Sequence, residues 1–282
     1  MAWRDRSRND GGSGQAESGA KARVIPGMLI ALAVVVIVAL ALALWLSSKS
    51  GDDGAPVPAP SPAPTSAASP GPEGVRALPE SEQMQKAAIA ALGAADGKVG
   101  EQDGQRTMTE PAGLFWDGDR AILISETGME DGCHGCSGSL GVHYLKPDGE
   151  DGLTVTGSWP DAIDGSSWGR PPAQWRVSRK FADVPVVYAT GGGTFQGYTC
   201  SVATLTRLGP DGPRAMVSIP LGYDDSGAVI SDTRTKLDGK IVNIVPGKRF
   251  DVHYTGTETF TDHYVRQGDR YVAQGKLRMQ SC

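Results

Sequence analysis

One segment of 22 residues, Ile25–Leu46, contains no charged side chain and consists mostly of Leu, Val, Ile and Ala. As an α-helix it would extend about 33 Å, which matches the hydrocarbon core of a bilayer. A helix also satisfies its backbone hydrogen bonds internally, as a membrane requires. Trp45 lies near the far end, where an indole ring favours the membrane interface. The sequence therefore predicts a transmembrane helix over 25–46 that contacts the lipid bilayer.

The charges on either side of this segment predict its orientation. Five basic residues precede it, whereas Lys49 is the one basic residue between it and Arg76. By the positive-inside rule, residues 1–24 form a cytoplasmic tail and the C-terminal bulk lies outside. Abundant Gly, Ala and Pro with only two Asn indicate a GC-rich bacterial genome. We therefore expect a single-pass protein of the bacterial cytoplasmic (inner) membrane.

Retention of the apolar segment is a separate question. Ala41-Leu42-Ala43 resembles a signal-peptide cleavage site. However, the apolar run is longer than the roughly 7–15 residues of a signal-peptide core, and it continues past this site. These features favour a retained signal anchor, with cleavage near Ala43 as the alternative.

Residues 47–79 are rich in Ser, Gly and Ala and include eight Pro. Such a stretch has too few apolar side chains to bury a core, and it favours polyproline II structure. It predicts a semi-rigid linker between the membrane and residues 80–282. All five Phe and all seven Tyr lie beyond residue 113, so a globular core is expected only in this C-terminal part.

The C-terminal part is expected to begin with one short helix. Pro79 suits the first turn of a helix, and acidic residues follow it. Met84, Ala88 and Leu92 recur at helical spacing and form one apolar stripe. We expect this helix to end near Asp96-Gly97 and to pack on a sheet.

Beyond residue 105 the pattern predicts antiparallel β-structure. Five pairs of apolar runs flank short turns rich in Gly, Asp and Pro, which is typical of β-hairpins. The expected hairpins cover 115–125, 142–156, 198–219, 241–254 and 263–272. Together they predict a mainly β fold, an antiparallel β-sandwich or barrel-like domain of about ten strands.

Four cysteines lie in the C-terminal part: Cys133, Cys136, Cys200 and Cys282. An even number of cysteines outside the cytoplasm predicts two disulfide bonds. Three connectivities are open, and we favour Cys133–Cys136 with Cys200–Cys282.

The Cys133-His134-Gly135-Cys136 motif has two alternative interpretations. A thiol–disulfide redox centre would need a helix N-terminus or a nearby cation to lower the thiolate pKa. Gly-rich flanks predict no helix there, although His134 lies between the cysteines. A zinc site would use both cysteines with two further ligands, but oxidation competes with zinc outside the cytoplasm. We therefore expect structural disulfides, no metal and no cofactor.

Two glycine-containing patterns resemble catalytic or phosphate-binding motifs. Gly165-Ser166-Ser167-Trp168-Gly169 matches the nucleophile-elbow pattern G-x-S-x-G, but the prolines after it forbid the helix that this motif needs. Gly191–Gly197 lacks the spacing of a dinucleotide-binding fingerprint and predicts a glycine-rich connection between strands. No residue is therefore assigned a catalytic role.

Polar side chains gather in the strands near the C-terminus. Asp251 and His253 alternate with apolar residues, and His263 follows on the next expected strand. In a favourable register all three would share one polar face. Such a face is more commonly solvated than metal-binding.

Aromatic residues supply the candidate binding surface. Trp159, Trp168 and Trp175 lie in a Pro/Gly-rich region, where exposed rings would serve ligand recognition. The net charge of −5 indicates no basic surface for nucleic acid. We expect a non-catalytic module that binds an envelope protein or a cell-wall ligand. A thiol–disulfide redox protein that uses Cys133 and Cys136, and a hydrolase with an unrecognised site, are the alternatives.

Overall fold

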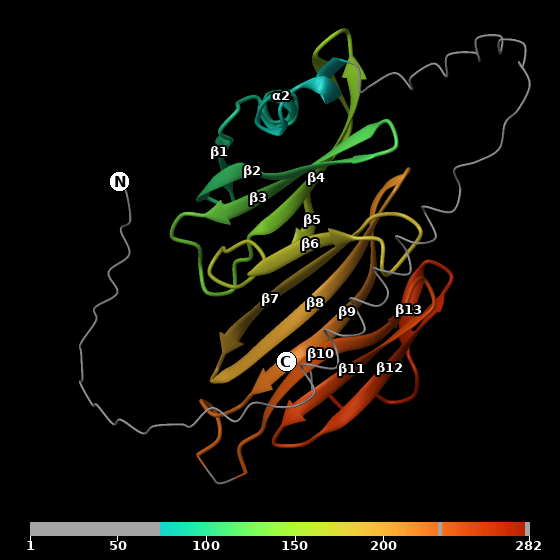
Figure 1. Ribbon diagram of the computed structural model, residues 1–282. Helices are drawn as coiled ribbons and strands as arrows, with labels where there is room; N and C mark the ends of the chain where they lie inside the picture. The colour runs from blue at the N-terminus through green and yellow to red at the C-terminus, as the bar shows by residue number, and fades with distance from the viewer. Residues whose placement is uncertain (1–73, 231–232, 280–282) are drawn as a thin grey trace, which may run out of the picture. The chain divides into compact units, whose positions relative to one another are not determined.

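The computed structural model describes residues 74–230 and 233–279, which form a mainly β fold of two antiparallel sheets (Figure 1). The first sheet has, in spatial order, β1 (Lys98–Gln102), β2 (Gln105–Asp117), β3 (Arg120–Met129), β4 (Ser139–Asp148) and β5 (Gly152–Asp164). The second sheet has, in spatial order, β13 (Arg270–Ala273), β12 (Phe260–Gln267), β11 (Arg249–Gly256), β10 (Lys236–Val245), β9 (Gly212–Asp224), β8 (Tyr198–Gly209), β7 (Val186–Phe195) and β6 (Gln174–Ser178). Within each sheet, strands that follow one another in sequence are therefore neighbours.

All five expected hairpins form, as the pairs β2–β3, β4–β5, β8–β9, β10–β11 and β12–β13. The expected number of about ten strands is too low, because thirteen are present in the described residues. The three strands outside the expected hairpins are β1, β6 and β7. Every residue of β1 is exposed, so this strand lacks the apolar alternation that marks the hairpin strands. Gly191–Gly193, which predicted a connection between strands, lies inside β7.

The expected helix is α2 (Glu80–Leu92), and it ends earlier than its sequence suggested. Gly93 has a φ of 88° and donates its backbone N–H to the Ile89 carbonyl at 3.0 Å, which closes the helix with a left-handed cap. Ala87 and Leu92 pack with Leu123 against one face of the first sheet, as expected. The 3₁₀ turn η1 (Gly74–Ala77) precedes this helix and buries Val75, so packed structure begins inside the stretch assigned to the linker.

The other face of the first sheet packs against the second sheet. Ile122, Ile124 and Val142 belong to a buried cluster on this face of the first sheet. The same cluster includes Val187 and Leu208, from β7 and β8. This interface makes the two sheets a sandwich over the strands β6–β8.

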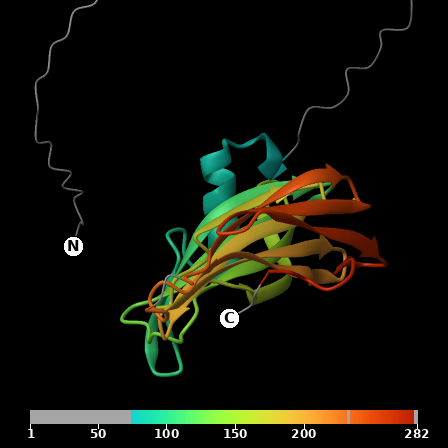
Figure 2. The ribbon, with the colours of Figure 1, turned by 90° about the horizontal axis from the view of Figure 1, so that it is seen from below.

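The rest of the second sheet curls into a half-barrel, as the turned view shows (Figure 2). Its inner face encloses an aromatic core in which the rings of Phe250 and Tyr264 stack at 4.9 Å. The Tyr271 hydroxyl donates to the Phe181 carbonyl at 2.8 Å, which ties the segment after β6 to β13. Met279 is also buried in this core.

Several expectations concern residues outside the described part of the chain. They are the cytoplasmic tail 1–24, the transmembrane helix 25–46, the linker up to residue 73 and Cys282. Among residues 74–230 and 233–279, no helix is long and apolar enough to cross a membrane.

Candidate functional site

The loop between β3 and β4 carries the Cys-x-x-Cys motif. Cys133 and Cys136 form a disulfide bond, as expected, with their Cα atoms 5.0 Å apart. The Cys136 N–H also donates to the Cys133 carbonyl at 2.9 Å, so a tight turn and a covalent bond hold His134 in the loop. Cys133 is exposed and Cys136 is half-buried. The other expected pair, Cys200–Cys282, includes a residue outside the described part and stays a prediction.

A second loop, residues 165–173, joins the two sheets and is called the intersheet loop. It docks on the loop between β3 and β4 that carries Cys133 and Cys136, which is called the disulfide loop. The Gly169 N–H donates to the Cys136 carbonyl at 2.9 Å, and the Gly169 carbonyl accepts from the Met129 N–H at 2.7 Å. Gly169 has a φ of 64°, and a Cβ there would lie 2.5 Å from the Met129 Cβ. A glycine is therefore required at residue 169 for the two loops to approach this closely.

The segment 165–169 does not form a nucleophile elbow. Ser166 and Arg170 instead pair in an isolated antiparallel bridge, and β6 is the next described element in the chain. The strand-to-helix turn that would expose a nucleophilic serine is absent from this part of the structure. The Ser167 N–H donates to the Gly192 carbonyl at 3.0 Å, which fastens the loop to β7.

Three rings from three separate segments form a stack at this site. The His134 ring lies 4.7 Å from the Trp168 ring and 4.8 Å from the Phe195 ring, with interplanar angles of 23° and 14°. Its Nε2 donates a hydrogen bond to the Thr194 carbonyl. Trp168 remains 52% exposed and Phe195 45% exposed. The histidine therefore fixes two aromatic rings at the surface while filling the space between them.

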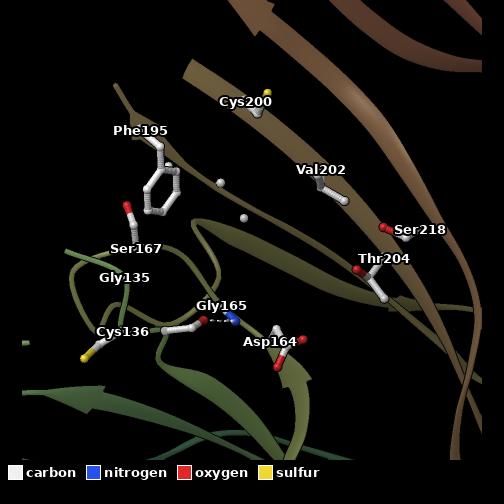
Figure 3. Close-up of a pocket in the computed structure, with 14 residues that line it drawn as sticks. Gly135, Cys136, Asp164, Gly165, Ser167, Phe195, Cys200, Val202, Thr204 and Ser218 are labelled. Atoms are coloured by element: carbon white, nitrogen blue, oxygen red, sulfur yellow. Dashed lines mark hydrogen bonds between the residues drawn. The ribbon is translucent and has the colours of Figure 1, made fainter. Parts of the chain in front are cut away.

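A pocket of about 330 Å³ opens beside this stack (Figure 3). Its walls come from the disulfide loop, the intersheet loop and the outer face of the second sheet. The lining residues are Gly135, Cys136, Ser137, Asp164, Gly165, Ser167, Gly191, Gly192, Gly193, Phe195, Cys200, Val202, Thr204 and Ser218. Phe195 belongs both to the wall and to the ring stack, so the stack begins at the pocket and continues through His134 to Trp168.

The glycines of β7 let the intersheet loop lie directly on the strand. A Cβ at Gly191 would be 2.3 Å from the Gly165 carbonyl oxygen, and one at Gly193 would be 2.7 Å from the Ser167 Oγ. Larger residues would push the loop away and change the shape of the pocket. The glycine run that the sequence displayed thus has a steric role in the site.

The walls of the pocket carry little charge, and apolar surface makes up the larger part of them. Asp164 is the one carboxylate among the lining residues, which include no Lys, Arg or His. The Ser137 Oγ is engaged, because it donates to the Gly138 carbonyl at 2.9 Å and accepts from the Gly165 N–H at 3.0 Å. The pocket therefore presents hydroxyls, backbone groups and one negative charge.

The structure does not bring the three tryptophans of the expected binding surface together as exposed rings. Trp168 is exposed in the ring stack, whereas Trp159 and Trp175 are half-buried and pack against the core between the sheets. The Trp159 ring meets the Tyr144 ring edge-on at 4.9 Å. The Trp175 Nε1 donates to the Glu126 Oε1 at 2.5 Å. Side-chain alternation along β5 and β6 places these two rings against the core, which a Pro/Gly-rich sequence did not reveal.

The strands near the C-terminus pair in the register that favours a shared polar face. Asp251 pairs with His263 across β11 and β12, and the His263 Nδ1 lies 2.7 Å from the Asp251 Oδ1. Asn243, at a bulge in β10, donates to the Asp251 Oδ2 at 2.9 Å. Burial raises the pKa of Asp251, but the hydrogen bonds from His263 and Asn243 outweigh it and bring the pKa below its ordinary value. The described residues hold no group of three or more Asp, Glu, His or Cys arranged for a metal ion.

One serine–histidine arrangement lies outside the residues that the sequence pointed to. The His143 Nε2 lies 3.0 Å from the Ser125 Oγ, and its Nδ1 lies 2.8 Å from the Ser158 Oγ. Burial, together with the charge of Lys98, lowers the pKa of His143 to about 4. A nucleophile–base pair has this spacing, but both Ser125 and His143 are buried and out of reach of a substrate. The arrangement satisfies buried polar groups in the first sheet.

Comparison with protein-family models, curated proteins and solved structures finds no match for this chain.

Proposed function

We propose that this protein is a non-catalytic binding module, held outside the bacterial cytoplasmic membrane by residues 25–46, which recognises an envelope ligand. One observation carries the proposal: the His134 stack holds Trp168 and Phe195 exposed beside an open pocket. Exposed aromatic rings next to a pocket with a few polar groups are typical of ligand recognition. The pocket lining contains one carboxylate and no histidine or basic residue, a composition poor in the acid–base pairs that catalysis uses.

The geometry of the site favours binding because the rings are already held in place. The disulfide, the hydrogen bond from His134 to the Thr194 carbonyl and the two docked loops restrict the rings before any ligand arrives. A preorganised surface loses less conformational entropy on binding than a mobile one. The membrane anchor and the Pro-rich linker would then present this surface to the envelope.

Retention of cell-envelope fractions by the immobilised protein tests this proposal. The full chain, purified in detergent, is immobilised and exposed separately to peptidoglycan, membrane vesicles and soluble envelope proteins of the producing cell. We expect retention of one fraction, weakened roughly tenfold by Trp168→Ala. Ile89→Ala is the matched control, because Ile89 is similarly exposed, at 54%, but lies on α2. Equal retention by the wild type and both variants would place any binding elsewhere and contradict the proposal.

Thiol–disulfide exchange is a second candidate function, favoured by the exposure of Cys133. An exposed sulfur can be attacked by a partner thiol, and His134 lies between the two cysteines. The motif leads into β4 instead of a helix, so a helix dipole does not lower a thiolate pKa there. Equilibration of the full chain with glutathione buffers distinguishes the functions. A disulfide that stays formed below about −300 mV is structural, whereas one that opens near the potential of oxidoreductases supports exchange.

A further inference from the structure

We infer that the pocket beside Phe195 binds an uncharged sugar ring, and that the envelope ligand is therefore a neutral glycan. This inference rests on the proposed binding function and names the ligand class. The groups that carry it are the polar side chains of the pocket wall and the aromatic ring of Phe195 (Figure 3). The capped edge of β7 supports it further.

Four polar side chains in the pocket wall have no partner within the described residues. They are Asp164, Ser167, Thr204 and Ser218, and none makes a side-chain hydrogen bond or an ion pair there. They come from β5, the intersheet loop, β8 and β9. Three hydroxyls and one carboxylate therefore face one space from different sides, and each is available to a ligand.

These groups match a hydroxyl-rich ligand. Serine and threonine hydroxyls both donate and accept hydrogen bonds, as sugar hydroxyls do, and the Asp164 carboxylate accepts from two donors. Phe195 adds an apolar ring surface to the same wall. A sugar ring offers a hydrogen-bonding rim and an apolar C–H face, so it satisfies both kinds of wall. A volume of about 330 Å³ is small for a ligand pocket and suits one ring instead of a folded chain.

Charge disfavours anionic ligands at this site. The lining residues include Asp164 but no Lys, Arg or His to compensate a phosphate or a carboxylate. Bringing a second negative charge beside Asp164 without a cation would be repulsive. Neutral saccharides avoid this repulsion.

An extended peptide is disfavoured because the exposed edge of β7 is already capped. Beyond Thr190, β7 has no partner in β6, and such an edge could accept an added strand. The intersheet loop donates to the Gly192 carbonyl from Ser167, and His134 donates to the Thr194 carbonyl. These acceptors are therefore occupied, and a peptide could not add there without displacing both loops.

Binding measurements with defined probes test the inference. The full chain in detergent is titrated with chitotetraose and with neutral tetrasaccharides of glucose, galactose and mannose, followed by tryptophan fluorescence and calorimetry, and a glycan array extends the panel. Tetramethylammonium and phenyl phosphate serve as cationic and anionic probes. We expect one neutral saccharide to bind, and Asp164→Asn and Ser218→Phe to weaken it at least tenfold. Asp211→Asn, which changes an exposed turn carboxylate away from the pocket, should leave binding unchanged.

The remaining outcomes separate this inference from the proposed function. If Ser218→Phe still binds the saccharide, then the saccharide binds outside this pocket and the inference is overturned. Binding of tetramethylammonium or phenyl phosphate without binding of any saccharide would overturn the assignment of a neutral glycan as the ligand. Retention of an envelope fraction by the protein would still support a binding module. If no probe binds and no envelope fraction is retained, both proposals fail. Circular dichroism of each variant confirms that lost binding does not reflect unfolding.

Discussion

The guanidinium group of Arg120, on β3, donates a hydrogen bond of 3.0 Å to the Gly209 carbonyl at the end of β8 in the other sheet. A second bond of 3.1 Å reaches the neighbouring Leu208 carbonyl. The same guanidinium stacks on the Tyr144 ring at 4.1 Å and pairs with Asp117 at 2.6 Å. One side chain thus connects the two sheets that together form the pocket.

Replacing Arg120 should lower the stability of the fold, because it removes a contact between the two sheets. Arg120→Ala removes charge-assisted hydrogen bonds to the Leu208 and Gly209 carbonyls. We therefore expect the free energy of unfolding to fall by about 2–3 kcal/mol. Urea titration followed by circular dichroism measures it. Arg214→Ala, which changes an exposed residue of β9, is the control and should change stability by less than about 0.5 kcal/mol. Equal losses for both variants would refute a bridging role for Arg120.

Opening the Cys133–Cys136 bond should affect the ring stack more than overall stability. The bond closes a very short loop, so the chain-entropy contribution is at most about 2 kcal/mol. A Cys133→Ser/Cys136→Ser variant should therefore stay folded, while Trp168 fluorescence shifts and envelope binding weakens. The measurements are thermal unfolding and tryptophan emission. Unchanged emission and binding would show that the hydrogen bonds between the loops suffice to hold the stack.

The stability of the fold should fall as the pH drops from about 6.5 to about 4 because of His143. Its pKa in the folded state is about 4, below the ordinary value of 6.5, so the unfolded chain binds more protons between these limits. His143 therefore contributes stability that is present above pH 6.5 and lost on acidification, up to about 3 kcal/mol. Urea unfolding at several pH values measures this slope.

A histidine variant isolates this effect. His143→Gln should lower stability at pH 7, because Ser125 and Ser158 lose their partner, and should flatten the slope between pH 6.5 and 4. His253→Gln changes an exposed histidine and should keep the wild-type slope. A slope that persists in His143→Gln would assign the pH dependence to other groups.

Gly191→Ala should displace the intersheet loop. The added Cβ would lie 2.3 Å from the Gly165 carbonyl oxygen, which is a backbone atom that cannot rotate away. We expect a loss of about 1–3 kcal/mol and weaker ligand binding, measured by unfolding and by titration. Gly135→Ala adds a methyl group where no atom lies within 4 Å, and it should leave stability nearly unchanged. Identical effects of the two variants would contradict the steric role of the β7 glycines.

Local sequence signals predicted the elements that depend on neighbours in the chain. Alternating apolar residues and turn glycines are sufficient for the five hairpins, because a hairpin pairs segments that lie next to each other in sequence. The apolar stripe through Leu92 predicted α2, and the three-residue spacing of Cys133 and Cys136 predicted their disulfide. Strand β1 escaped prediction because all its residues are exposed and no burial pattern marks it.

The candidate site depended on tertiary structure. His134, Trp168 and Phe195 lie in different segments, and their stack exists because two loops dock on the glycine strand β7. No periodicity within a segment encodes which distant loop packs against it. The sequence therefore determined the ten strands of the five hairpins, the helix and one disulfide bond. Only the packing of one sheet on the other decided that Trp168 would face solvent while Trp159 and Trp175 joined the core, because burial is settled by the partner surface and not by the residue itself.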